Sequence, residues 1–409
     1  RQLGRRGNVV EYFAGSPCGT RGDGTSEWAE VGKTTMTIVI AAGGTGGHLY
    51  PAIALAREFL RRDPSTKILF VGTSRGIESR VLAHEGLELI MITAKPVMGK
   101  GLLEALRAVL SVPIGIWQSW QLLGQRQADL VIGVGGYTSP TVLVAAALRG
   151  ISRVIVEPNA YPGLANQVVG PFAQRIFLAF ESAATRFDRQ KVHVVGTPIR
   201  QEFREYQPES QETIRRNGPH LLIFGGSQGA RAINSAVLEG LPLLRARLPT
   251  LTITHQTGEG DYERVREGYR VLGIEATVVP FLYDMPTVLR AADVVVARAG
   301  AMTIAEVTAC GKPAILVPLP TAIYDHQMKN ARAMEAEGGA VVLPQTELTG
   351  ATLSELVDGI VSNSQRWDSM HRGSLAMRRI DAGERIVGEC YAIMGVKHDI
   401  NQSLRKAGG

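Results

Sequence analysis

Residues 36–48 read Met36-Thr-Ile-Val-Ile-Ala-Ala-Gly-Gly-Thr-Gly-Gly-His48, an apolar run that ends in a cluster of glycines. The apolar run predicts a strand over 37–42 that is buried on both faces, as in a parallel sheet. Glycines directly after such a strand are typical of a tight turn into a helix, whose free N–H groups bind anions. The stretch therefore predicts the first strand and the first turn of a Rossmann-like domain.

The alternation of apolar runs and helical patterns continues to residue 156 and starts again at residue 220. This order is typical of βαβ units in a parallel sheet. The sequence thus predicts an α/β protein of two Rossmann-like, doubly wound domains whose strand ends can face a shared cleft. The predicted strands are 37–42, 67–72, 87–92, 130–134, 153–156, 220–225, 250–256, 275–280, 293–297 and 314–317; the predicted helices are 51–62, 76–85, 102–126, 139–149, 228–247, 259–270, 302–310 and 325–337.

The polar stretch 201–219 suggests where the first domain ends. Residues 1–35 show no sustained periodicity and lack the apolar core of a signal peptide, so we expect Met36 to be the native start. The expected organisation is an N-terminal extension over 1–35, an N-terminal domain over 36–198, a C-terminal domain over 199–375, a helix near 376–395 that packs back on the N-terminal domain, and a tail over 396–409.

Composition excludes several classes of protein. The net charge of +6 comes without the dense basic stripes of a nucleic-acid binder, so no nucleic-acid partner is expected. Cys18, Cys310 and Cys390 are few and far apart, which indicates a reducing, cytosolic compartment. The uncharged stretches 108–125 and 130–148 are interrupted by proline and glycine, so neither is predicted to span a membrane.

Two further glycine-rich corners lie in the second half of the chain. In Gly225-Gly-Ser-Gln-Gly-Ala230, Ser227 can donate to a phosphate at the first turn of a helix, or it can be an ordinary N-cap. In Ala299-Gly-Ala-Met-Thr-Ile-Ala-Glu306, the Glu306 carboxylate can accept both hydroxyls of a ribose, or it can be a solvated helix glutamate. Together with Gly43–His48, these corners indicate a nucleotide diphosphate as ligand.

Polar corners also follow the later strands of the first half. Gly133-Val-Gly-Gly-Tyr-Thr-Ser-Pro140 is a strand-to-helix turn that exposes Tyr137. The loop Glu157-Pro-Asn-Ala-Tyr-Pro-Gly-Leu-Ala-Asn166 holds Asn159 and Asn166, whose amides suit sugar hydroxyls or can cap turns. Neither a Walker loop nor a complete dinucleotide fingerprint is present, because Leu49 occupies the third glycine position. Asp-x-Asp, His-Glu-x-x-His and Cys-x-x-Cys are absent, so no metal site is predicted.

The motifs GGTGGHLYPA, GVGGYTSP, EPNAxPGLAN, GTPIR, GGSQGA, ARAGAMTIAE and DHQxxNA occur here in this order. Over roughly residues 36–395 the chain resembles the MurG family, the bacterial UDP-N-acetylglucosamine transferases that complete the lipid-linked peptidoglycan precursor. The resemblance implies a GT-B fold and an inverting transfer of N-acetylglucosamine to undecaprenyl-diphospho-N-acetylmuramoyl pentapeptide, without cofactor or essential metal. It also implies a peripheral protein on the cytoplasmic face of the inner membrane.

The resemblance carries residue roles with it. His48, with an ordinary pKa near 6.5 and a place where the glycine turn meets its helix, is the candidate general base; a structural histidine that fixes the turn is the alternative. Tyr137 and Asn166 are further catalytic candidates. In the family a glutamine usually stands where this chain has Pro158. The implied donor contacts are Thr45, Gly46, Gly47, Asn159, Arg200, Ser227, Leu282, Ala301, Met302, Thr303, Ile304, Ala305, Glu306 and Gln327.

The stretch 95–110 combines basic residues with an apolar helical pattern, and tryptophans follow it. Such a segment can rest on an anionic membrane surface, or it can bury its apolar stripe in the domain. The residues expected at the membrane are Lys95, Lys100, Leu102, Leu103 and Leu106. Two other functions suit the same architecture: a UDP-N-acetylglucosamine 2-epimerase, which needs no lipid acceptor, and a sensor that binds a nucleotide sugar without turnover.

Overall fold

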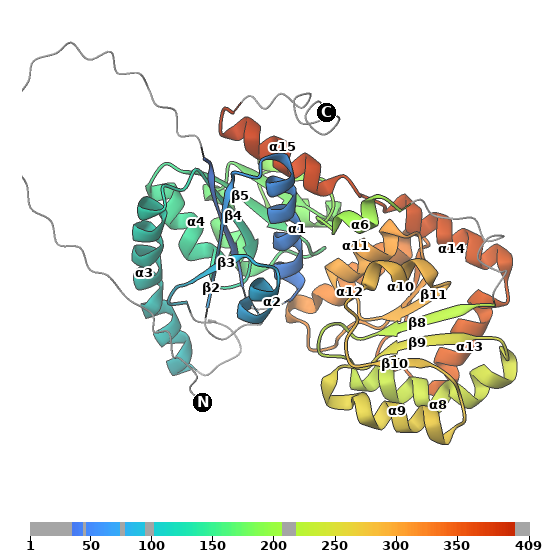
Figure 1. Ribbon diagram of the computed structural model, residues 1–409. Coiled ribbons are helices and arrows are strands. Elements are labelled where there is room, and N and C mark those ends of the chain that lie inside the picture. Colours follow the sequence, from blue (N-terminus) through green and yellow to red (C-terminus); the bar gives the residue numbers. More distant parts are fainter. Residues whose placement is uncertain (1–34, 44–45, 74–77, 95–101, 207–217, 397–409) are drawn as a thin grey trace, which may run out of the picture. The chain divides into compact units, whose positions relative to one another are not determined.

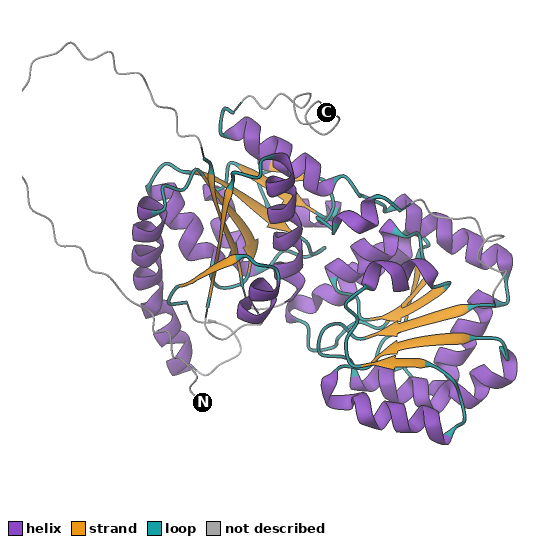
Figure 2. Ribbon diagram, in the orientation of Figure 1, coloured by secondary structure: helices purple, strands orange, loops and turns teal. Residues whose placement is uncertain are grey.

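The computed structural model describes residues 35–43, 46–73, 78–94, 102–206 and 218–396, with the backbone alone over 102–110. These residues belong to one compact unit. It contains two all-parallel sheets with helices on both faces of each (Figures 1 and 2). Thr45, Lys95, Lys100 and most of the predicted extension and tail lie outside the described residues. The predicted domain boundaries therefore stay predictions.

The first sheet has seven strands in the order β3-β2-β1-β4-β5-β6-β7. The buried part of its four central strands is mainly apolar, as expected for a parallel sheet covered on both faces, and the buried polar residues Thr37 and Glu157 lie at strand ends. The strands are β1 (Thr37–Ala42), β2 (Lys67–Gly72), β3 (Glu88–Met91), β4 (Leu130–Gly135), β5 (Ser152–Glu157), β6 (Arg175–Leu178) and β7 (Val192–Val194).

Helices from both ends of the chain cover this sheet. On one face, α1 (Gly46–Arg62), α2 (Glu78–His84) and α15 (Ala382–Ile393) share a core with the strands. The other face carries α3 (Leu102–Gln125), α4 (Ser139–Leu148) and α5 (Leu164–Val169). The packing of α15 against α1 ties the last described helix to the first sheet, which Figure 1 shows. Short 3-10 turns are η1 (Gly170–Phe172), η2 (Glu181–Arg186) and η3 (Arg189–Lys191).

The second sheet repeats the same strand order with six strands, β10-β9-β8-β11-β12-β13. One face is covered by α8, α9, α13 and α14, and the other by α6, α10, α11 and α12. The strands are β8 (His220–Phe224), β9 (Thr252–Gln256), β10 (Thr277–Val279), β11 (Val294–Ala297), β12 (Ala314–Leu316) and β13 (Ala340–Val342). The helices are α6 (Gln201–Arg204), α8 (Arg231–Arg247), α9 (Tyr262–Val271), α10 (Met285–Ala291), α11 (Ala301–Ala309), α12 (His326–Ala336), α13 (Gly350–Val361) and α14 (Ser364–Ala376), with 3-10 turns η5 (Glu259–Asp261) and η6 (Ile323–Asp325).

Each sheet has a point where the strand order reverses, between β1 and β4 in the first and between β8 and β11 in the second. In open α/β sheets, ligands bind beyond the carboxyl ends of the strands at this point. The corners Gly43–His48, Gly133–Pro140, Gly225–Ala230 and Ala299–Glu306 follow these four strands. The topology therefore places all four glycine corners at the two predicted binding edges.

Two helix starts differ from the prediction. Helix α1 begins at Gly46 and not at residue 51, so Pro51 lies inside it. Pro51 lies beyond the first turn, so α1 lacks the hydrogen bond that an N–H at this position would donate to the carbonyl oxygen of Gly47. Helix α8 begins at Arg231 and not at residue 228. The delay arises because Gly226 and Gly229 have φ of 86° and 74°, in the left-handed region that interrupts a helix.

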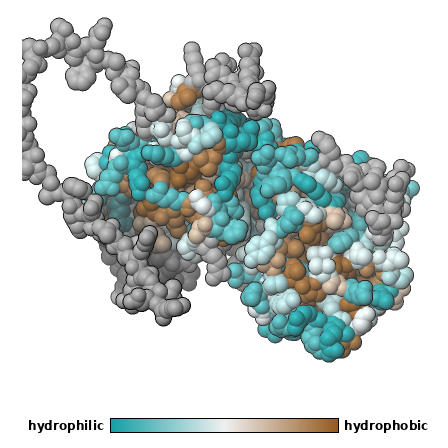
Figure 3. All heavy atoms as spheres, viewed as in Figure 1, coloured by the Kyte–Doolittle hydropathy of each residue, from teal (hydrophilic) through white to brown (hydrophobic). Residues whose placement is uncertain are grey.

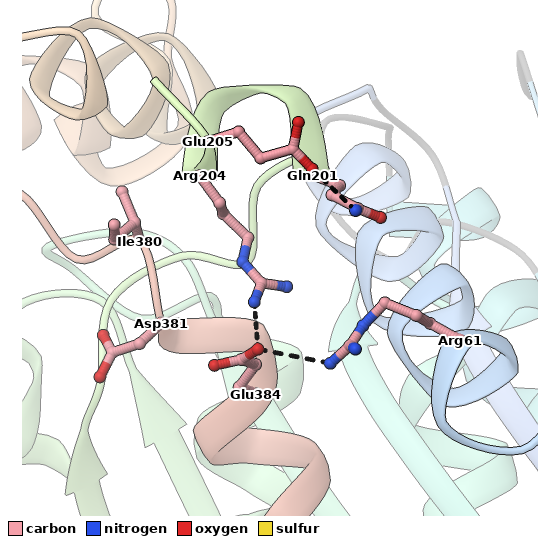
Figure 4. Close-up of a pocket in the computed structure, with 7 residues that line it drawn as sticks. All are labelled: Arg61, Gln201, Arg204, Glu205, Ile380, Asp381 and Glu384. Atoms are coloured by element: carbon pink, nitrogen blue, oxygen red, sulfur yellow. Dashed lines mark hydrogen bonds and ion pairs between the residues drawn. The ribbon is translucent and has the colours of Figure 1, made fainter. Parts of the chain in front are cut away.

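A buried carboxylate joins α1 to the α6 segment. The Glu58 side chain is 4% exposed and accepts hydrogen bonds from Arg61, Arg62 and Arg204 at 2.8–3.1 Å. Burial raises the pKa of Glu58, but the arginine hydrogen bonds outweigh it and the net shift is downward. Glu384 of α15 accepts from Arg61 and Arg204 at the rim of a pocket (Figure 4). None of the predicted site residues lines that pocket. We therefore assign a structural role to its ion pairs and leave the pocket out of the candidate active site.

We expect Glu58→Gln to lower the free energy of unfolding by about 2 kcal/mol, because it removes the charge of a buried carboxylate that accepts hydrogen bonds from three arginines. Urea denaturation measures the change. The matched control is Glu88→Gln, which removes an exposed ion pair with Arg126 and should change the free energy by less than about 1 kcal/mol. Equal effects of the two substitutions would show that the α1–α6 connection does not depend on Glu58.

Candidate active site

The two glycine corners of the first sheet touch each other through their main chains. Gly136 has φ of 78°, and a Cβ there would lie 2.1 Å from the carbonyl oxygen of Gly43. A Cβ on Gly135 would lie 2.7 Å from Cδ2 of His48. No side chain larger than hydrogen fits at either position. The corners therefore form one surface, with the His48 imidazole packed against it.

His48 lies in the first turn of α1, together with Gly46 and Gly47. Burial lowers its pKa to about 4, and the nearby charge of His326 acts in the same direction. The N-terminus of α1 also disfavours a positive charge. At neutral pH the ring is consequently uncharged and can accept a proton. Its role as general base stays a prediction.

Tyr137 and Asn166, the other catalytic candidates, have different surroundings. The Tyr137 hydroxyl is half-buried and 3.1 Å from Oγ1 of Thr73. Asn166 is 1% exposed and donates from Nδ2 to Oε2 of Glu157 at 2.9 Å. Its Oδ1 is buried, and no described residue donates to it. Asn166 is thus built into the loop after β5, whereas Tyr137 lies at the surface of a corner.

Glu157 organises this loop, a role that the sequence analysis missed. Its buried carboxylate accepts from the N–H groups of Asn159 and Gly163 and from the amides of Asn159 and Asn166, at 2.9–3.1 Å. Burial raises the pKa of Glu157, and these donors partly offset the rise. The amide of Asn159 is engaged on both sides, because its Oδ1 accepts from Asn330 at 3.2 Å. A proline at position 158 is compatible with this arrangement, because all the donors to the Glu157 carboxylate belong to residues after it.

The corner after β8 is held by main-chain contacts as well. Gly229 has φ of 74°, and a Cβ there would lie 2.0 Å from the carbonyl oxygen of Thr257. Ser227 is exposed and precedes α8, so the expectation that it lies in the first turn of the helix is wrong. The exposed turn leaves its hydroxyl and neighbouring N–H groups open to an anion.

The corner after β11 leads into α11. Gly300 is the N-cap, and Ala301, Met302, Thr303, Ile304 and Ala305 make up the first turns before Glu306. Glu306 is 8% exposed and accepts from Nη2 of Arg200 at 3.1 Å, so it is not a solvated helix residue. Burial raises its pKa, and Arg200 partly offsets the rise. A carboxylate that is paired with a guanidinium in this way can exchange partners with a polar ligand.

The remaining predicted contacts lie outside these corners, after β10 and in α12. Leu282 is half-buried and packs with the residues around α11. Gln327, in the first turn of α12, accepts from the N–H of Leu319 through Oε1 at 3.0 Å. Among the described residues, no group of three or more His, Cys, Asp or Glu side chains could hold a metal ion. The expectation of a reaction without metal is not tested by this observation.

Two family models match the chain. The glycosyltransferase family 28 N-terminal domain matches residues 38–178, and the C-terminal domain of the same family matches residues 220–386. The chain belongs to glycosyltransferase family 28. The matches coincide with the two sheets, and they confirm the prediction of a glycosyltransferase with two Rossmann-like domains.

Individual similar proteins indicate which group within this family the chain resembles. A protein of Syntrophotalea carbinolica is 44% identical over 88% of this chain and 99% of its own length; it is named UDP-N-acetylglucosamine–N-acetylmuramyl-(pentapeptide) pyrophosphoryl-undecaprenol N-acetylglucosamine transferase. The crystal structure of Acinetobacter baumannii MurG is similar with a TM-score of 0.70 and 28% identity, covering 87% of this chain and 99% of that one. The MurG resemblance and the GT-B fold are therefore confirmed.

A putative UDP-N-acetylglucosamine 2-epimerase from Listeria monocytogenes is also similar, with a TM-score of 0.62. It is 14% identical, and the similarity covers 88% of this chain and 96% of that one. This likeness extends to the fold alone. The higher identity and the family models favour the transferase group over the epimerase.

The depressed pKa of His48 predicts a pH-dependent stability. The unfolded chain takes up a proton near pH 6.5, whereas folded His48 does so near pH 4, so the stabilising contribution is complete above pH 6.5 and is lost as the pH falls towards 4. We expect His48→Gln to reduce the loss of unfolding free energy between pH 7 and pH 5 by up to about 2 kcal/mol. Urea denaturation at both pH values measures this. Exposed His84, replaced by glutamine, is the control and should leave the loss unchanged.

Proposed function

We propose that this protein transfers N-acetylglucosamine from UDP-N-acetylglucosamine to the 4-hydroxyl of N-acetylmuramic acid in undecaprenyl-diphospho-N-acetylmuramoyl pentapeptide. The main support is the relative with that transferase name, which matches over 99% of its own length at 44% identity. The four glycine corners at the reversal points of the two sheets support it independently. The product is the disaccharide-lipid used in peptidoglycan synthesis, on which cell shape and division depend.

The donor is proposed to bind at the second sheet. The turn with Ser227 and the first turn of α11 offer N–H groups to the diphosphate and sugar, and Glu306 accepts the ribose hydroxyls. Leu282 lies against the base, and Gln327 meets the sugar. Arg200 pairs with Glu306 in the described structure. We propose that Arg200 adds positive charge beside the departing diphosphate, the role that a metal ion has in other transferases.

The chemical step is a single displacement with inversion. The acceptor 4-hydroxyl oxygen attacks C1 of N-acetylglucosamine, the bond from C1 to the diphosphate oxygen breaks, and UDP leaves with the electron pair. His48 takes the proton of the attacking hydroxyl, a contribution of about 10² to 10⁴-fold for a well-placed base. Its uncharged state at neutral pH suits this role. Tyr137 and the loop with Asn159 and Asn166 are proposed to line the acceptor side.

Two substitutions separate donor binding from chemistry. We expect Glu306→Ala to raise the donor KM about tenfold or more, because it removes the ribose contacts, with a smaller effect on kcat. We expect His48→Ala to lower kcat at least 100-fold with little change in KM. The assay follows labelled UDP-N-acetylglucosamine into the disaccharide-lipid with a short-chain acceptor analogue, and Glu88→Gln is the control.

Near-normal kcat of His48→Ala at saturating acceptor would reject the general base. Failure of the wild-type protein to form the disaccharide-lipid would reject the function itself. Formation of a manno sugar without acceptor would identify an epimerase, and binding of the nucleotide sugar without turnover would identify a sensor.

We propose a peripheral attachment to the cytoplasmic face of the inner membrane through α3. Ile114, Trp117 and Trp120 are 51%, 58% and 43% exposed on this helix. The guanidinium of Arg149 lies 3.7 Å from the Trp120 ring centroid, which places a positive charge beside the exposed aromatic surface. Figure 3 shows apolar residues gathered on the visible face of the first domain. Exposed aromatic and basic groups of this kind suit a membrane interface.

The residues that the sequence predicts at the membrane precede the exposed residues of α3 in the chain. Lys95 and Lys100 lie outside the described residues, and the side chains of Leu102, Leu103 and Leu106 are not described. No helix among the described residues is long and apolar enough to cross a membrane.

We expect the triple substitution Ile114→Ser, Trp117→Ser, Trp120→Ser to abolish flotation with phosphatidylglycerol vesicles, because it removes the apolar contact. The soluble short-chain acceptor should still be glycosylated at the wild-type rate. The control pair Val271→Ser, Leu272→Ser removes exposed apolar side chains of α9 and its C-cap and should float like the wild type. Flotation of the α3 variant would contradict the assignment, and so would loss of flotation in the control.

A further inference from the structure

The side chain of Asn330 joins three segments of the chain that are distant in sequence. It is completely buried on α12. Its Oδ1 accepts from the N–H of Ala160 at 2.7 Å, and its Nδ2 donates to Oδ1 of Asn159 at 3.2 Å and to the carbonyl oxygen of Ala299 at 3.3 Å. Every hydrogen bond that the amide makes thus goes to the loop after β5 or to the corner after β11.

All three segments belong to the candidate active site. Asn330 lies three residues after Gln327, so the two side chains are on the same side of α12. Ala299 directly precedes Gly300, the N-cap of α11. The loop after β5 is made rigid by the buried Glu157 carboxylate. One buried amide therefore sets the positions of α12, the α11 corner and this loop relative to each other.

The start of α12 is strained and is held by the same loop. Tyr324 and Asp325 have φ of 56° and 55°, a left-handed conformation that is unfavourable for non-glycine residues. Nζ of Lys329 donates to the carbonyl oxygen of Tyr324 at 3.0 Å and lies 3.6 Å from the ring centroid of Tyr161, in the loop after β5. Lys329 and Asn330 thus connect both the strained turn and the helix to that loop. Strain of this kind persists only where the surroundings enforce it.

We propose that Asn330 is a positioning residue for sugar transfer: it holds the start of α12, and with it Gln327, in register with the loop that carries Asn159. The proposal rests on the proposed function, because it assigns the sugar side of the donor to α12. We assign Asn330 no contact with the donor, because its amide is completely buried and bonded to the loop after β5 and to the corner after β11. Asn330 therefore affects the binding of the N-acetylglucosamine group of the donor. It does not affect the binding of uridine and ribose, which are assigned to Leu282 and Glu306.

The experiment compares UDP with UDP-N-acetylglucosamine. Calorimetry gives the Kd of each, and the transfer assay gives kcat and KM for wild type, Asn330→Ala, Asn159→Ala and the double variant. We expect UDP affinity to stay within about twofold, while kcat and the preference for UDP-N-acetylglucosamine over UDP both fall about tenfold or more. The double variant should be no worse than the poorer single variant, because both substitutions remove one connection.

Ser354→Ala is the matched control, since Ser354 is also completely buried and hydrogen-bonded, to the carbonyl oxygens of Gly240 and Gly350 on the far face of the second sheet. It should lower Tm without changing the preference or kcat. Lys329→Met, an exposed position that should not affect folding, provides a second test if Asn330→Ala does not fold; we expect it to lower kcat about threefold at unchanged UDP affinity.

The proposal is overturned if Asn330→Ala lowers Tm alone, as Ser354→Ala does, or if it weakens UDP and UDP-N-acetylglucosamine equally. A kcat of Lys329→Met equal to wild type, where Asn330→Ala does not fold, overturns it as well. Transfer by the wild-type protein is measured in the same series, so a failure of the proposed function is recognised separately.

Discussion

The site depends on main chains that approach each other where no side chain fits. Gly136 lies against the carbonyl oxygen of Gly43, and Gly229 lies against that of Thr257, so each corner is shaped by contact with a neighbouring strand end. The Gly136 contact joins the ends of β1 and β4, where the order of the parallel strands reverses, whereas the Gly229 contact joins the ends of the neighbouring strands β8 and β9. The consequence is a set of N–H groups and helix N-termini at the edge of each sheet, fixed before a ligand arrives. Such fixed donors stabilise developing negative charge without reorganisation during the reaction.

Buried carboxylates connect these corners to the rest of the molecule. Glu157 orders the loop after β5, Glu306 holds Arg200, and Glu58 fixes the arginines between α1 and α6. Each of them is satisfied by charged or N–H donors, as a buried carboxylate must be. The carboxylates differ in whether a ligand can replace their donors. Glu306 pairs with Arg200 and can exchange this partner for ribose hydroxyls, whereas Glu157 is fully engaged by its own loop.

The sequence predicted the features that depend on local pattern. Apolar runs located the central strands, and glycines at their ends located all four corners. The start of α1 was missed because Pro51 is typical of a first helical position, and the start of α8 was missed because the φ values of Gly226 and Gly229 cannot be read from residue type. The roles of Glu157 and Asn330 could not be predicted from residue type. Asn330 stands in a recognised motif, yet its partner Ala160 is 170 residues away.

We propose that main-chain N–H groups, with Arg200, carry the donor diphosphate. A crystal structure with UDP-N-acetylglucosamine, grown in the presence of a chelator, tests it most directly. The account predicts diphosphate and sugar oxygens within about 3 Å of N–H groups of the corner after β8 and of the first turn of α11, with Glu306 at the ribose. A nucleotide bound away from these corners, or one that binds only through a divalent cation, would contradict it.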